Sequence, residues 1–122
     1  MLPNQLEITG HPASPAAFQI EKVKEQNGVS TYKRIFPSGD ELQIDVRHTD
    51  EKKSGNVQYE RHNFDVKYTI FNADTLRGND VYHFYIVIRR KKGTIAQNSE
   101  ENVTSILPQV AWLVPRLLAG EY

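Results

Sequence analysis

The 122-residue chain has the size of one domain, and 25% of its residues are charged, with 15 basic and 15 acidic side chains. It lacks cysteine, which excludes disulfides, thiol catalysis and thiolate metal sites. No stretch approaches the roughly 18 apolar residues that span a bilayer, and residues 1–10 lack the basic start and apolar run of a secretory signal. We expect a single domain over residues 1–122 without a membrane partner.

The distribution of charge matters more than its sum. A net charge of zero counts against nucleic-acid binding, because such proteins are usually basic overall. Residues 57–92, however, hold seven basic against four acidic side chains, a local excess of +3. The middle of the chain is therefore the part suited to an anionic partner.

The first part of the chain reads as short strands separated by turns. Residues 6–9 alternate weakly and predict a short first strand. Residues 17–24 and 29–36 read as strands, and Asn27-Gly28 between them is a strong hairpin signal. Residues 37–40, with the sequence Pro-Ser-Gly-Asp, predict the next turn.

Three longer strands follow at residues 41–49, about 57–71 and 80–91. Each carries apolar side chains at even positions and mostly polar ones at odd positions, as expected for an antiparallel sheet covered on one face. The even positions hold Leu42, Ile44, Val46, Phe64, Val66, Tyr68, Ile70, Tyr82, Phe84, Ile86 and Ile88.

After Gly93 the apolar residues recur at steps of three and four, which predicts a helical tail at about 98–119. Pro108 and Pro115 interrupt this pattern, so we expect two helices or one kinked helix. Strands at about 5–92 followed by helices indicate an α+β fold with an antiparallel sheet.

Such a short meander leaves open edges and an apolar face larger than a helical hairpin can cover. A two-fold dimer would solve both problems, with sheets joined edge to edge and helices lying across the partner's sheet. The pattern alone leaves a monomer equally open.

Three segments, Val46–Thr49, Val57–Asn63 and Val87–Arg89, resemble the coat proteins of single-stranded RNA bacteriophages, in particular those that infect Caulobacter. The resemblance implies an N-terminal hairpin, a five-stranded antiparallel sheet and two C-terminal helices. It also implies an obligate homodimer with a continuous ten-stranded sheet. Dimers would form a T=3 icosahedral capsid in the host cytoplasm, and the loop at residues 72–79 would gather at the shell's symmetry axes.

The same resemblance implies that the inner sheet face binds genomic RNA and represses replicase translation through an RNA hairpin. Arginine and lysine neutralise phosphates, amides read base edges, and the Tyr85 ring could stack on an unpaired base. Asp45 and Asp65 interrupt this face and could pair with Arg47 and Lys67. A one-residue bulge would move side chains to the other face. The predicted RNA-binding residues are Gln43, Arg47, Arg61, Asn63, Lys67, His83, Tyr85, Arg89 and Lys91.

Other interpretations of these residues remain open. The polar positions could form a solvated sheet face, or belong to a non-viral dimeric RNA-binding module. A small dimeric enzyme could use His83 with Asp45 or Asp65. His48 and His62 fall on the apolar side, so we expect core or interface histidines rather than a converging site. We expect no cofactor and no small-molecule substrate, although carboxylates between subunits could hold a divalent cation.

Overall fold

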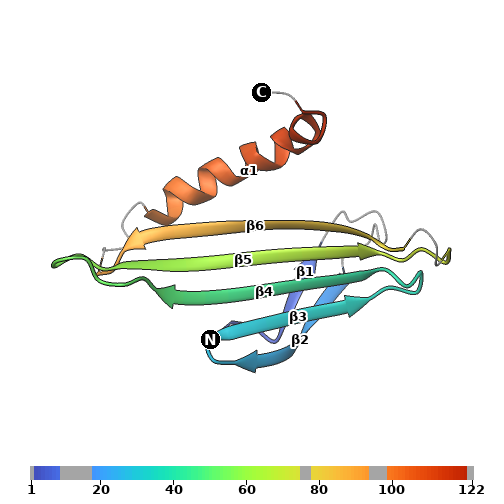
Figure 1. The fold of residues 1–122 in the computed structure, drawn as a ribbon, viewed down its shortest axis with the longest axis horizontal. Helices are drawn as coiled ribbons and strands as arrows, with labels where there is room; N and C mark the ends of the chain where they lie inside the picture. Colours follow the sequence, from blue (N-terminus) through green and yellow to red (C-terminus); the bar gives the residue numbers. More distant parts are fainter. Residues whose placement is uncertain (1, 9–17, 75–77, 94–98, 121–122) are drawn as a thin grey trace. The chain divides into compact units, whose positions relative to one another are not determined.

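A computed structural model describes residues 2–8, 18–74, 78–93 and 99–120. The chain forms two compact units, residues 1–92 and 93–122. The first unit is one antiparallel sheet whose six strands follow each other in chain order (Figure 1). The strands are β1 (Gln5–Ile8), β2 (Phe18–Gln26), β3 (Val29–Ile35), β4 (Glu41–Asp50), β5 (Tyr59–Ile70) and β6 (Asp80–Lys91).

The predicted turns are confirmed at the two positions where backbone conformation demands them. Asn27 and Gly28 have φ values of 53° and 76°, the left-handed pair that a tight hairpin requires. Gly39 has a φ of 92°, and a Cβ there would lie 2.9 Å from the Phe71 ring. The next residue, Asp40, accepts bonds of 3.0 Å from the Tyr68 hydroxyl and from the Phe71 amide.

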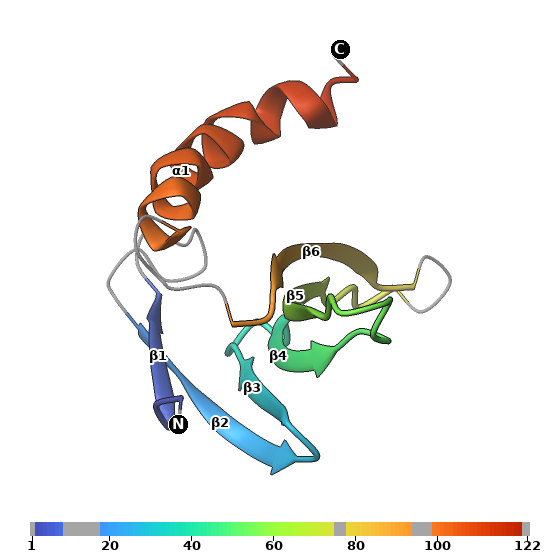
Figure 2. The same ribbon diagram turned by 90° about the vertical axis from the view of Figure 1, so that its left-hand side faces the viewer.

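The hairpin and the sheet are continuous, which differs from the expected separate hairpin and five-stranded sheet. β2 pairs with β1 on one side and with β3 on the other. The β2–β3 register shifts between Lys22 and Lys24, and a bulge of this kind increases the local twist. The sheet curls so that β1 and β2 turn away from the plane of the longer strands (Figure 2).

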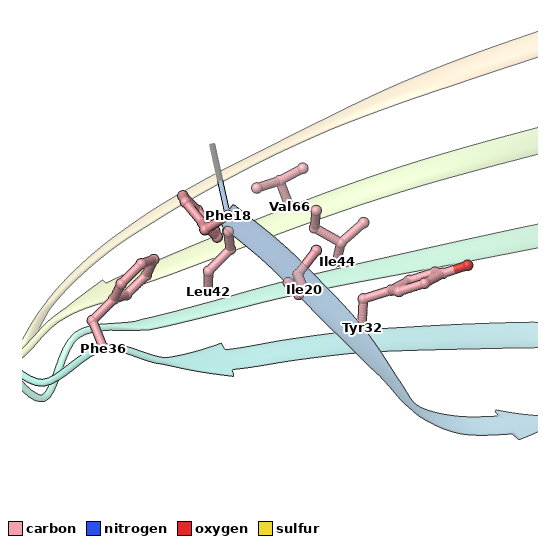
Figure 3. Packing of buried hydrophobic residues seen from close by; sticks show 7 residues of the cluster. All are labelled: Phe18, Ile20, Tyr32, Phe36, Leu42, Ile44 and Val66. Atoms are coloured by element: carbon pink, nitrogen blue, oxygen red, sulfur yellow. The ribbon is translucent and has the colours of Figure 1, made fainter. Parts of the chain in front are cut away.

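This curl builds the core, because it places the apolar sides of β1 and β2 against those of β3, β4 and β5. Ile20 and Tyr32 are fully buried, and the Tyr32 hydroxyl donates a 2.6 Å hydrogen bond to the Pro3 carbonyl. The even-numbered apolar residues of β6 stay outside this core: Tyr82 and Phe84 are each 55% exposed. The buried cluster consists of Phe18, Ile20, Tyr32, Phe36, Leu42, Ile44 and Val66 (Figure 3).

Within residues 99–120, the second unit contains one helix, α1 (Ser99–Leu118), with Pro108 and Pro115 inside it. Of the two arrangements that the prolines allowed, this part of the chain has the single helix. Pro108 cannot donate to the carbonyl of Thr104, and such a missing bond bends a helix. The curvature is visible in Figure 2.

One side of α1 carries a row of apolar residues at helical spacing. We call this row the apolar stripe, and it consists of Ile106, Val110, Leu113, Val114 and Leu117. Their exposed fractions range from 40% for Leu113 to 61% for Ile106. A stripe of this kind normally faces a core, and within the second unit α1 itself does not bury it.

Candidate nucleic-acid interface

The side chains expected to bind RNA lie on one face of three neighbouring strands, which we call the polar face: the odd-numbered residues of β4, β5 and β6. The register between these strands contains no shift. Gln43, Lys67 and His83 lie side by side across the strands, and Arg61 lies opposite Arg89. The parity that placed all nine residues on one face is therefore confirmed: Gln43, Arg47, Arg61, Asn63, Lys67, His83, Tyr85, Arg89 and Lys91.

At one end of the polar face two arginines share a glutamate. Arg89 Nε donates to both carboxylate oxygens of Glu51, at 2.8 and 2.9 Å, and Arg61 Nε lies 3.7 Å from Glu51 Oε1. The Arg89 guanidinium carbon lies 3.8 Å from the centroid of the Tyr59 ring. The hydrogen bond from Arg89 lowers the pKa of Glu51, and the same bond raises the pKa of Arg89.

Sequence reasoning missed Glu51, because this residue follows β4 and lies outside the alternating pattern. Its backbone is nevertheless fixed: the Glu51 amide donates to the Tyr59 carbonyl at 2.9 Å, and the Gln58 side chain donates to the Glu51 carbonyl at 3.2 Å. The carboxylate therefore projects from an ordered position beside two strands. No periodicity in the sequence marks Glu51 as a site residue, because it lies in the loop directly after β4.

The centre of the polar face is acidic, since Asp45 and Asp65 lie directly opposite each other. Asp45 accepts from the Thr31 hydroxyl at 2.6 Å and from the Gln43 amide at 3.1 Å. Asp65 accepts from Arg47 at 3.2 Å. Of the expected pairing of Asp45 and Asp65 with Arg47 and Lys67, the structure shows the pair of Asp65 with Arg47, which lie diagonally across β4 and β5, whereas Asp45 bonds to Thr31 and Gln43 instead.

Two histidines meet on the opposite face. His48 and His62 are cross-strand partners, and their Nδ1 atoms lie 2.7 Å apart. His62 Nε2 lies 3.5 Å from Glu60, which pairs with Arg90. The sequence predicted the face of these histidines correctly but not their contact, because alternation defines a face and says nothing about which strands become neighbours.

His83 lies on the polar face, away from the histidine pair, with its ring centroid 6.0 Å from that of Tyr85. Its cross-strand partner is Lys67, whereas Asp45 and Asp65 accept hydrogen bonds from other side chains. This arrangement does not place a carboxylate to orient His83 as a base. Within residues 2–8, 18–74, 78–93 and 99–120, no three histidine or acidic side chains are grouped so as to hold a metal ion.

The glutamate–arginine pairs predict a pH dependence of stability. Hydrogen bonds from Arg89 and Arg90 lower the pKa values of Glu51 and Glu60. A lowered carboxylate pKa contributes stability above its unfolded value, and this contribution disappears as the pH falls through the folded value. We expect wild type to have a higher urea midpoint than Glu60→Gln at pH 7 and the two to converge below about pH 4. A constant difference across this range would contradict the role of ionised Glu60.

One comparison with known proteins identifies a family. A family model described as phage phiCb5, coat protein, matches residues 3–91, which include all six strands. No curated protein matches the chain. Among the described residues, no helix is long and apolar enough to cross a membrane.

A coat protein is a structural component of the virion, so the enzyme and non-viral alternatives do not apply. The matched region ends before α1, and the polar face lies wholly inside it. The chain therefore belongs to the coat-protein family of phage phiCb5 and is a capsid subunit of an RNA bacteriophage.

Proposed function

We propose that this capsid subunit binds genomic RNA through the polar face and so packages the genome. The observation that carries the proposal is the unbroken register of β4, β5 and β6, which gathers Arg47, Arg61, Lys67, Arg89 and Lys91 on one surface. Basic side chains neutralise phosphates and give sequence-independent affinity. A capsid's inner surface needs affinity of this kind, since it must hold RNA of many sequences.

Tyr85 and Asn63 add the chemistry that recognises bases. The Tyr85 side chain is 66% exposed, so one side of its ring can accept an unpaired base by stacking. Its cross-strand partner is Asp65, whose carboxylate would repel phosphate. RNA on this face therefore runs with its phosphates near the arginines and lysines and its bases toward the acidic centre. Binding of a specific hairpin, with repression of replicase translation, is the finer form of the same proposal.

Two adjacent arginines offer a matched test. Arg89 lies on the polar face and pairs with Glu51, whereas Arg90 lies on the other face and pairs with Glu60. We expect Arg89→Gln to lower the RNA retained by purified particles and Arg90→Gln, with the same loss of charge, to leave it near wild type. The measurement is absorbance at 260 and 280 nm on particles checked by electron microscopy. Equal RNA loss in both variants would point to overall charge rather than to the polar face.

We further propose that the working unit is a two-fold homodimer. β6 is an edge strand of 12 residues with apolar side chains exposed along it, and exposed edges of this length invite pairing with another strand. Pairing of two β6 edges would join the two six-stranded sheets into one sheet of twelve strands, in place of the ten that the family resemblance implies. The apolar stripe of α1 would then cover the apolar side of the partner's sheet. A T=3 shell built from such dimers stays a prediction.

A further inference from the structure

The polar face contains two neighbouring positive charges whose repulsion is unfavourable for the sheet. Arg61 and Arg89 lie directly opposite each other on β5 and β6. Like charges in this position destabilise a sheet. The side chains of Arg61 and Arg89 are 44% and 51% exposed, so each lies partly against the sheet and does not extend fully into solvent.

The carboxylate of Glu51 offsets the repulsion between Arg61 and Arg89. This carboxylate takes both Nε hydrogen bonds of Arg89 and lies 3.7 Å from Arg61, so one negative charge serves two positive ones. The trio keeps a net charge of +1. The Tyr59 ring supports the Arg89 guanidinium from one side at 3.8 Å.

The geometry also decides which edge of Arg89 remains for a ligand. Both hydrogen bonds to Glu51 come from Nε, and an arginine has four further N–H donors on its two Nη atoms. A guanidinium fixed by a carboxylate at Nε and by a ring below it presents these donors in a defined direction. Such a fork matches the two oxygens of a phosphate.

We propose that Glu51 is a positioning residue that holds Arg61 and Arg89 as a two-arginine clamp for one phosphate of single-stranded RNA. The inference rests on the proposed RNA-binding function of the polar face and names the part of it that binds phosphate. Glu51 acts through the arginines and touches no RNA itself.

A positioning role for Glu51 predicts that loss of its charge weakens RNA binding, whereas net charge alone predicts that it strengthens RNA binding. Removal of an acidic side chain from an RNA-binding surface should strengthen binding if only net charge matters. If Glu51 positions the clamp, Glu51→Gln frees both arginines to move and to repel each other, and binding weakens. Glu60→Gln is the matched control, because Glu60 also pairs with an arginine but lies on the opposite face.

The experiment measures binding of a short single-stranded RNA oligonucleotide to recombinant coat protein over a series of salt concentrations. We expect Glu51→Gln to weaken binding about 5-fold or more and to reduce the slope of log K against log salt by about 0.7, the value for one single-stranded phosphate. Glu60→Gln should bind as wild type or slightly tighter. Tighter binding by Glu51→Gln with an unchanged slope would overturn the proposal.

Two further variants separate failure of the clamp from failure of the RNA-binding face. Arg89→Lys keeps the charge but loses the fork, and we expect it to weaken binding as Glu51→Gln does. The double variant Arg61→Gln with Arg89→Gln removes the clamp entirely. If this double variant binds RNA as wild type, the polar face is not the RNA site. If it binds weakly while Glu51→Gln and Arg89→Lys bind as wild type, the face is correct and the positioning role is wrong.

Discussion

Replacement of Ile20 with alanine is expected to lower the free energy of unfolding by about 2–5 kcal/mol. Ile20 is fully buried where the curled β2 packs over β3 and β4, and its removal leaves a cavity in the centre of the core cluster. Among the described residues the core contains seven buried apolar side chains, so little surrounding structure can collapse into that space. Equilibrium unfolding in urea, followed by circular dichroism, measures the change.

Ile35→Ala is the matched control for this substitution. Ile35 lies at the end of β3, removes the same side-chain atoms when replaced, and is 66% exposed. We expect a change of about 0.5 kcal/mol or less, as for most surface positions. Equal destabilisation by the two substitutions would mean that β2 does not close the core in solution.

The second large effect concerns the helix. Val110→Asp together with Leu113→Asp should abolish both the dimer and the assembled particles. Both residues belong to the apolar stripe, and carboxylates there would have to be buried without partners when the stripe packs against a second subunit. Light scattering after size exclusion measures the dimer, and electron microscopy of the same fractions measures assembly.

Thr104→Asp together with Ser105→Asp is the control for added charge. These two positions lie on the side of α1 away from the apolar stripe, so the net charge changes equally while the stripe stays intact. Normal particles from this control and none from the stripe variant would support packing of α1 between subunits. Particles in normal yield from the stripe variant would show that α1 is not part of the dimer contact.

Local patterns carried most of the information on the strands. The Asn27-Gly28 turn, the Pro37–Asp40 turn and the alternation in residues 41–49 and 80–91 each depend on neighbours in sequence, and each was predicted to within a few residues. The start of β5 was placed two residues early, because the Ser54 and Val57 backbones bond to each other and delay the strand. The split of polar and apolar faces followed from side-chain alternation once β4, β5 and β6 paired without a bulge.

Side-chain contacts between residues distant in sequence could not be predicted from local patterns. Glu51 and Arg89 are 38 residues apart, and no periodicity links a loop glutamate to an arginine on the sheet's edge strand. Which of the two aspartates pairs with Arg47 was likewise not predictable, because distances between diagonal cross-strand residues depend on sheet twist.

The sequence by itself determined the order of elements, the face on which each strand residue lies and the family to which the chain belongs, since each of these depends on residue type and spacing. Only the tertiary structure decided that the hairpin joins the sheet, that α1 is a single bent helix, that His48 meets His62, and that Glu51 lies between two arginines. The physical reason is the same for all four: strand curl and helix bending are small local deviations that add up over many residues, and side-chain contacts follow from where that sum places the backbone.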